Sequence, residues 1–186
     1  VVPPKAFHER LRALTTTHGM LLMVDEVQSG MGRTGKMWAI EHFGVQPDVV
    51  TAGKGIASGR PLGVTLAKAD VMAWPPGAHA STFGGNPVSC AAAIATIGLL
   101  RESLVKNAAE VGDHLQQGLR ALIDKHPLIG DVRGKGLMVG VELVRDRTTK
   151  ERATTERNAV VDEAFKRGML ILGAGRNAVR FSPPLV

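Results

Sequence analysis

The chain has no tyrosine and only one cysteine, Cys90, among its 186 residues. A single cysteine excludes an internal disulfide, which is typical of a reducing compartment, so we expect a cytoplasmic protein. No apolar run reaches the roughly 18 residues needed to cross a bilayer. The first apolar stretch, residues 20–24, lies inside the chain and is no signal peptide. The sequence therefore predicts no association with a membrane.

Acidic residues are outnumbered by basic ones, and the formal net charge is +6. Such a charge can indicate nucleic-acid binding when the basic residues cluster. Here they are dispersed, and the densest patch, "RDRTTKER" (145–152), also contains Asp146 and Glu151. We interpret this patch as a solvated turn or helix start and expect no nucleic-acid partner. We identify no metal site.

An initiator methionine is also missing. The chain begins with "VVPP" and stops after "FSPPLV", directly behind an apparent strand. We therefore expect the sequence to be a piece of a longer protein.

Helical and strand patterns alternate in the first part of the chain. A helix from Pro4 to about Thr17, with Pro4 in its first turn, precedes an apolar strand at 20–24 that is typical of burial on both faces. A short helix at 37–44 and buried strands at 48–52 and 63–67 follow. This alternation predicts an α/β fold with a mainly parallel sheet.

The pattern changes at Pro87. A long helical stretch with a break near residues 98–102 is followed by strands at 136–144, 169–173 and 178–182, and by a helix near 155–167. We interpret this part as an α+β unit and place the domain boundary near Leu100, which gives domains 1–100 and 101–186.

The first chemical motif is "LLMVDEVQSGMGRTGK" (21–36), in which a predicted strand ends in acid. Open α/β sheets bind ligands at the carboxyl ends of their strands. Because strand side chains alternate, Asp25 and Val27 point one way and Glu26 the other. A carboxylate beside a branched apolar side chain suits a flat, partly charged ring. The structural alternative is that Asp25 caps the glycine-rich turn that follows.

Lys54 follows the next strand and lies between Gly53 and Gly55. Two neighbouring strands that end in Asp25 and Lys54 would bring both side chains to one edge of the sheet. Pyridoxal phosphate requires this pair: a lysine for the Schiff base and a carboxylate opposite the pyridinium nitrogen. The glycines leave room for a cofactor against the backbone. A single lysine is usually a solvated surface residue, but the pairing with Asp25 favours the cofactor interpretation.

A third motif is "ASTFGGNP" (80–87), which leads into the long helix. Hydroxyls of Ser81 and Thr82 and free backbone N–H groups at a helix start form a natural phosphate site. An ordinary helix start, with Asn86 as the N-cap and Pro87 in the first turn, accounts for the last two residues alone.

These residues together resemble the class III pyridoxal-phosphate-dependent aminotransferases of fold type I, the group of 4-aminobutyrate, acetylornithine and ornithine aminotransferases. The segment "VDEVQSGMGRTGKMWAIEHFGVQPDVVTAGKGIASGRPLG" is similar to the family's signature block. "STFGGNP", "VRGKGLMVGVEL" and "VRFSPPLV" follow in the family's order. The resemblance covers essentially the whole chain. It implies the C-terminal part of the large cofactor domain and most of a truncated small domain.

The resemblance also implies a role for each candidate residue. Lys54 would be the Schiff-base lysine and proton carrier, Asp25 would hold the pyridine nitrogen, and Val27 would pack on the ring. Gln28 would bind the phenolic oxygen, and Thr82 the phosphate of the cofactor in the other subunit of a homodimer. Arg180 would bind the substrate carboxylate, because a planar guanidinium grips a carboxylate with two parallel bonds.

The expected reaction is transfer of an amino group from an ω-amine, with 4-aminobutyrate and 2-oxoglutarate as the preferred donor and acceptor. "LILGAGRNAVRFSPP" (170–184) is the stretch that favours this subgroup. Acetylornithine or ornithine transamination and amino-acid racemisation remain alternatives on the same fold. Family elements that would precede Val1 include a phosphate loop, a stacking aromatic residue and a glutamate. A non-catalytic fragment is therefore a further alternative.

Overall fold

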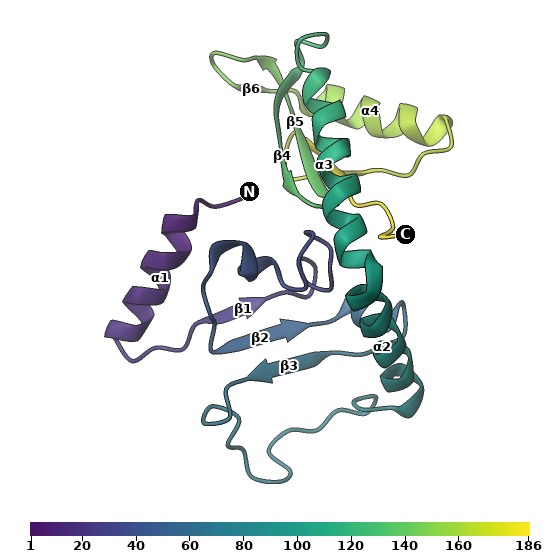
Figure 1. Ribbon diagram of the computed structural model, residues 1–186. Coiled ribbons are helices and arrows are strands. Elements are labelled where there is room, and N and C mark those ends of the chain that lie inside the picture. The colour runs from purple at the N-terminus through teal and green to yellow at the C-terminus, as the bar shows by residue number, and fades with distance from the viewer. The chain divides into compact units, whose positions relative to one another are not determined.

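The computed structural model describes residues 1–186, which divide into two compact units. One unit is Pro3–Lys106, and the other is Asn107–Val186 together with Val1–Val2. The boundary predicted near Leu100 lies in the same long helical segment as this division (Figure 1).

Helix α1 (Lys5–Thr17) begins one residue later than expected, because Pro4 is its N-cap and has extended dihedral angles. Gly19 follows the helix with a φ of 63°, and Met20 N donates to Thr15 O, which closes the last turn. Phe7 and Leu14 are both 52% exposed, so the expected apolar face is not buried as a whole.

The sheet of the first unit has the order β1-β2-β3. Strands β1 (Met23–Asp25) and β2 (Val49–Ala52) are parallel, as expected, with Asp25 opposite Thr51. Strand β3 (Val64–Ala67) pairs with β2 in the antiparallel direction. The short connection between β2 and β3 explains this direction, because a parallel pair requires a longer crossover.

Strand β1 is not buried on both faces, which corrects the expectation for residues 20–24. Met23 is 63% exposed, whereas Leu22 is only 7% exposed. Leu22 belongs to a small core with Ile40, Phe43 and Val45. Ile40 and Phe43 lie in the 3₁₀ helix η1 (Ala39–Phe43), which the sequence predicted as a short helix. One face of the sheet therefore packs on η1 and α1.

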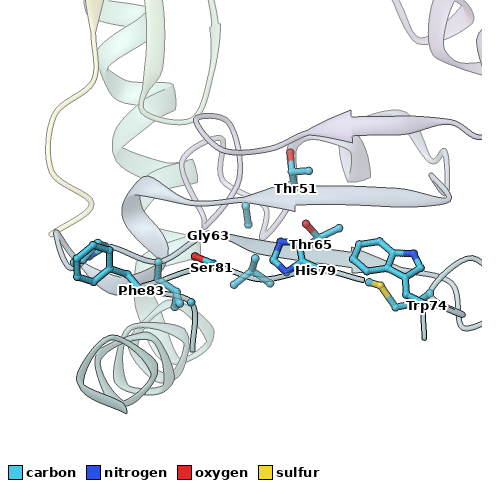
Figure 2. Close-up of a pocket in the computed structure, with 13 residues that line it drawn as sticks. Thr51, Gly63, Thr65, Trp74, His79, Ser81 and Phe83 are labelled. Carbon is cyan, nitrogen blue, oxygen red and sulfur yellow. The ribbon is translucent and has the colours of Figure 1, made fainter. Parts of the chain in front are cut away.

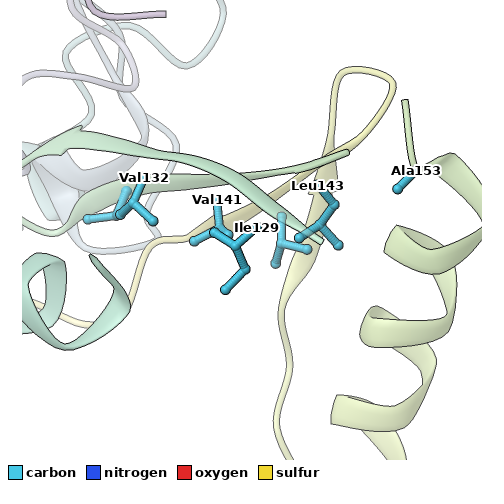
Figure 3. Packing of buried hydrophobic residues seen from close by; sticks show 7 residues of the cluster. Ile129, Val132, Val141, Leu143 and Ala153 are labelled. Atoms are coloured by element: carbon cyan, nitrogen blue, oxygen red, sulfur yellow. The ribbon is translucent and has the colours of Figure 1, made fainter. Parts of the chain in front are cut away.

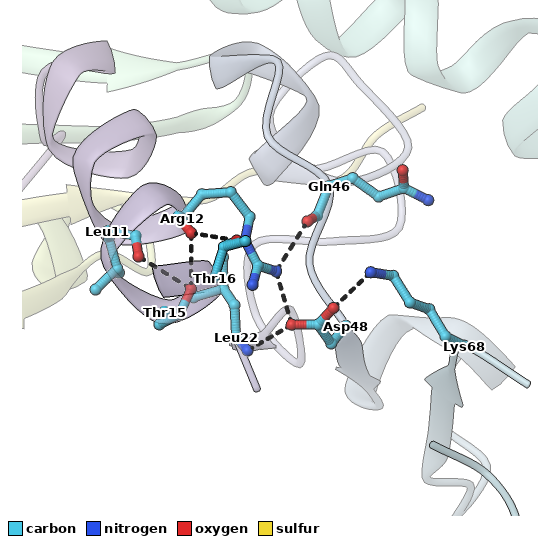
Figure 4. A network of polar contacts seen from close by, with 8 residues as sticks. All are labelled: Leu11, Arg12, Thr15, Thr16, Leu22, Gln46, Asp48 and Lys68. Carbon is cyan, nitrogen blue, oxygen red and sulfur yellow. Dashed lines mark hydrogen bonds and ion pairs between the residues drawn. The ribbon is translucent and has the colours of Figure 1, made fainter. Parts of the chain in front are cut away.

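A buried carboxylate joins all the elements of this sheet. Asp48 Oδ2 accepts hydrogen bonds from Leu22 N (2.8 Å) and from Arg12 of α1 (2.6 Å), and its Oδ1 accepts from Lys68 Nζ (2.6 Å) (Figure 4). The Asp48 side chain is 8% exposed. Its contacts with Lys68, Leu22 N and Arg12 hold the pKa of Asp48 well below its usual range.

The chain is helical from Pro87 to Ala121, but not uniformly. Helix α2 (Pro87–Leu99) passes through a π-helical turn (Leu100–Leu104) into α3 (Val105–Ala121), so the expected break is a π turn. Asn86 is the N-cap, as predicted, and its Oδ1 accepts from Ser89 N (2.9 Å). By length and composition this segment is apolar enough to cross a bilayer, a property that core helices of soluble proteins share.

The second unit is built on an antiparallel sheet in the order β4-β5-β8-β7. Its strands are β4 (Ile129–Lys135), β5 (Met138–Asp146), β7 (Leu172–Ala174) and β8 (Ala178–Phe181), and the short β6 (Glu151–Arg152) pairs with β5. Helix α4 (Thr154–Lys166) packs beside β5, β7 and β8. Figure 3 shows the apolar core of this unit. The sequence predicted these elements except β4 and β6.

Candidate active site

Lys54 lies two residues beyond β2, where the backbone turns into the 3₁₀ helix η2 (Lys54–Ala57). Its φ of 46° is left-handed, which is unfavourable for a residue with a side chain and is characteristic of functional sites. Burial of Ala57 (0% exposed) and Ile56 (5%) fixes η2 against α2, and Ser58 Oγ lies 2.8 Å from Thr96 Oγ1. The Lys54 side chain itself is exposed. A packed turn thus presents an exposed amine.

Asp25 ends β1, directly beside the strand that carries Lys54. Its Oδ1 accepts a hydrogen bond from Val27 N (2.9 Å), so the turn-cap interpretation describes a real contact. The cap leaves Oδ2 without a partner, and the residue is exposed. Asp25 and Lys54 form no ion pair with each other, although they lie at the carboxyl ends of adjacent parallel strands. Each charge is therefore available to a ligand placed between them.

The turn after Asp25 brings two further predicted residues to Lys54. Lys54 Nζ donates to Gln28 Oε1 at 3.3 Å, and this is the one hydrogen bond of the amine. A Cβ placed on Gly53 would lie 3.4 Å from Val27 Cγ1, so Val27 faces the backbone next to Lys54. Asp25, Val27, Gln28 and Lys54 thus form one group at one edge of the sheet, which we call the Lys54 edge.

Ser81 and Thr82 lie in the exposed loop before α2 and make no hydrogen bond to this group. Ser81 lines a hollow of about 630 Å³ over β2 and β3 (Figure 2). The labelled residues around this hollow are Thr51, Gly63, Thr65, Trp74, His79, Ser81 and Phe83. The hollow also includes Ala52 at the end of β2, but neither Ser81 nor Thr82 is hydrogen-bonded to Lys54 within one chain.

Arg180 lies on β8 of the second unit, between Gly140 of β5 and Leu172 of β7. Its Nε is buried and has no hydrogen-bond partner. Buried donors in folded proteins are nearly always paired, so an unpaired guanidinium N–H indicates a missing acceptor. The role of Arg180 in binding a substrate carboxylate stays a prediction.

Glu26 is the residue that the sequence singled out only by its direction. It is 1% exposed, on the opposite side from Asp25, as the strand alternation predicted. Its partners are Ile40 N (2.8 Å) and Ser29 Oγ (2.5 Å). The contact with Ile40 could not be predicted, because Ile40 belongs to the next element. No group of three or more His, Cys, Asp or Glu side chains is arranged to hold a metal ion.

The chain belongs to the class-III aminotransferases, because the family model, described as aminotransferase class-III, matches residues 1–186. Members of this family depend on pyridoxal phosphate. The α/β fold matches the solved structures of aminotransferases. An aminotransferase of Bacillus anthracis superposes with a TM-score of 0.94 at 36% identity, over 100% of this chain and 45% of the other.

Curated relatives include both transaminases and racemases. A leucine/methionine racemase of Thermococcus litoralis is 46% identical over 100% of this chain and 42% of its own length. An acetylornithine aminotransferase of Gloeobacter violaceus is 43% identical over 97% of this chain and 43% of its own length. The chain thus spans less than half the length of the relatives that it matches.

Proposed function

We propose that these residues form part of a pyridoxal-phosphate-dependent aminotransferase. The observation that supports this most directly is the Lys54 edge. Asp25 and Lys54 lie at the carboxyl ends of two adjacent parallel strands and do not pair with each other. Lys54 has a φ in the left-handed region. The donor set also fits the cofactor, since it contains an amine, a carboxylate, an amide and a branched apolar side chain.

Each residue of the Lys54 edge has a definite task in this proposal. Pyridoxal phosphate supplies an electron-withdrawing ring that accommodates the negative charge developing on the substrate carbon. Lys54 Nζ holds the cofactor and, when released, carries a proton. The carboxylate of Asp25 keeps the ring nitrogen protonated, Val27 covers one face of the ring, and Gln28 binds its phenolic oxygen.

The phosphate residues belong to a second subunit in this proposal. Ser81 and Thr82 are exposed on the loop before α2 and are free to reach another chain. We propose a homodimer in which Thr82 binds the cofactor phosphate of the partner subunit.

For the substrate we propose an amino acid whose carboxylate meets Arg180, with a 2-oxoacid as acceptor. The unpaired Nε of Arg180 supports a carboxylate ligand. Transfer from 4-aminobutyrate to 2-oxoglutarate is the reaction we expect from residues 170–184. The acetylornithine aminotransferases among the relatives support acetylornithine or ornithine as the alternative donor.

Amino-acid racemisation is a second candidate. The relative from Thermococcus litoralis is a leucine/methionine racemase, and one from Pyrococcus horikoshii, 41% identical, is an alanine/serine racemase. Both reactions begin with the same proton abstraction, so the Lys54 edge serves either. They differ in whether the amino group leaves with the cofactor.

The deciding experiment uses the full-length protein and its Lys54→Ala variant. We expect Lys54→Ala to lose the visible absorbance of the lysine-bound cofactor, and to lose turnover by at least about 10⁴-fold, since one residue performs both tasks. Lys36→Ala is the control, because Lys36 Nζ only contacts Glu41 O. Normal turnover in Lys54→Ala would refute the proposal.

A substrate panel separates the remaining candidates. 4-Aminobutyrate, acetylornithine and ornithine are each tested with 2-oxoglutarate, with release of glutamate as the readout. L-Leucine and L-alanine are incubated without an oxoacid and followed by chiral chromatography. Loss of optical purity without any acceptor identifies a racemase, whereas glutamate release identifies a transaminase and its donor.

A further inference from the structure

Glu26 faces away from the Lys54 edge and has no part in the chemistry proposed above. Its side chain is almost completely removed from water, at 1% exposure. Burial of a carboxylate is unfavourable unless strong hydrogen bonds replace its hydration. The groups that supply these bonds therefore indicate what the carboxylate does.

Glu26 connects three segments of the first unit. Its Oε1 accepts from Ile40 N at η1 (2.8 Å), and its Oε2 accepts from Ser29 Oγ (2.5 Å). Its backbone N donates to Thr51 O of β2 (2.9 Å). Neither group that donates to the Glu26 carboxylate is a cation, so this carboxylate is not the counter-ion of a basic residue. Its side chain binds instead to Ser29, in the turn that follows Glu26, and to Ile40 N in η1.

The turn formed by residues 26–30 is tightly closed. Gly30 N donates to Glu26 O at 3.0 Å. A Cβ on Gly30 would come within 2.7 Å of Glu26 O and 2.9 Å of Trp38 Cε3, closer than real contacts allow. A side chain at position 30 would clash with this turn, so the turn requires glycine there.

Gln28 lies in the middle of this closed turn, and its Oε1 is the acceptor for Lys54 Nζ. We propose that Glu26 is a positioning residue: by binding Ser29 and Ile40 N, it fixes the 26–30 turn so that Gln28 is set against Lys54. Glu26 touches neither the cofactor nor the substrate. This inference rests on the proposed function, because its effect is on the surroundings of the cofactor.

The test compares Glu26→Gln, Gln28→Ala and the double variant in the full-length protein loaded with pyridoxal phosphate. The readout is the midpoint pH at which the visible absorbance of the bound cofactor changes. We expect Glu26→Gln to shift this midpoint by about half a pH unit or more, the effect of roughly one hydrogen bond. The shift should have the same direction as in Gln28→Ala.

The double variant decides whether Glu26 acts through Gln28. If it does, Glu26→Gln adds no further shift once Gln28 is alanine. Additive shifts would overturn the proposal, and so would an unchanged midpoint in a Glu26→Gln protein that only unfolds at lower temperature. If Glu26→Gln does not fold, Ser29→Ala replaces it, because this variant removes one donor to Glu26 without burying a new group. We expect Ser29→Ala to shift the midpoint pH in the same direction.

Asp48→Asn is the matched control. Asp48 is also a buried carboxylate of this unit that binds backbone N–H, but its partners lie at the other end of the strands. We expect a lower unfolding temperature and an unchanged midpoint pH. Lys54→Ala keeps the two proposals apart. If it retains the lysine-bound absorbance, the proposed function fails, whereas a failure confined to the Glu26 variants removes only the positioning role.

Discussion

Asp25 is the residue whose structural and chemical roles a single substitution can separate. Asparagine keeps the Oδ1 that accepts from Val27 N but removes the negative charge. We expect Asp25→Asn in the full-length protein to fold normally and retain cofactor, with kcat lowered by about 10²-fold or more. The reason is that the neutral amide cannot keep a ring nitrogen protonated. Thermal unfolding, cofactor absorbance and kcat are the measurements.

The control for Asp25 is another aspartate that caps a turn. Asp146 Oδ1 accepts from Thr148 N (2.7 Å) and Thr149 N (2.6 Å) in the second unit. Asp146→Asn should leave kcat within a factor of about two, because this contact is purely structural. If Asp25→Asn behaves like Asp146→Asn, Asp25 is a turn cap and the ring-nitrogen role is wrong.

At the residue scale, the sequence predicted side-chain directions better than backbone conformations. Strand alternation correctly separated Asp25 from Glu26, because a period of two follows from local backbone geometry. The left-handed φ of Lys54 was not predicted. The burial of Glu26 against Ile40 N depends on a segment that follows it in the chain.

At the scale of elements, Asp48 should make the first unit sensitive to acid. Its pKa is held below the usual range, so it stabilises the fold fully above the unfolded-state pKa of about 3.9. That contribution is lost as the pH falls through and below about 4. We expect Asp48→Asn to be less stable than wild type at pH 7, with the difference shrinking below about pH 4.

The measurement is the unfolding temperature of both full-length proteins from pH 7 to pH 3. Only the difference between them is informative, because other carboxylates also titrate in this range. A gap that stays constant down to pH 3 would show that the charge of Asp48 contributes nothing, and that Arg12 and Lys68 are ordinary surface cations.

Helix α3 offers a pair of glycines with opposite expectations. A Cβ on Gly112 would lie 2.2 Å from the backbone carbon of Gly136, in the turn between β4 and β5, whereas Gly118 has nothing within 4 Å. We expect Gly112→Ala to lower the free energy of unfolding by about 1–3 kcal/mol through overpacking. Gly118→Ala should stabilise by about 0.5–1 kcal/mol through helix propensity. Thermal unfolding of the two variants compares them directly, and equal effects would contradict the close approach.

The elements that the sequence missed are those without a local signal. Strand β4 contains Gly130, Asp131 and Gly134, all poor strand formers, and it is stabilised by pairing with β5. The direction of β3 was also missed, because apolar composition does not distinguish parallel from antiparallel pairing. The break that the sequence predicted near residues 98–102, in contrast, overlaps the π turn at Leu100–Leu104.

At the scale of the whole molecule, each unit exposes apolar side chains that a stable surface would not carry. Around β1, an edge strand, Met20, Leu21 and Met23 are at least 50% exposed. In the second unit, Phe165 and Leu170 are 67% and 83% exposed. Unpaired edges and apolar patches of this kind promote association. This exposure is consistent with the match to less than half of each relative's length, because the rest of such a protein would cover these side chains.

We therefore expect residues 1–186, expressed alone, to associate or aggregate and to show no transamination of 4-aminobutyrate with 2-oxoglutarate. Asp25, Gln28 and Lys54 are all present, but they cover one side of a ring at most. Thr82 has no partner subunit in a chain that does not assemble correctly. Lysines of such a chain would react with pyridoxal phosphate without selectivity, so absorbance near 400 nm should persist in Lys54→Ala.

The experiment measures size by light scattering and glutamate release by a coupled assay, for the fragment and the full-length protein side by side. Turnover in the fragment that Lys54→Ala abolishes would contradict this expectation. It would mean that the two strand ends and one turn suffice to hold and activate the cofactor. The rest of the protein would then determine which donor binds, since the proposed contact of a substrate carboxylate with Arg180 carries no information on the length of the substrate.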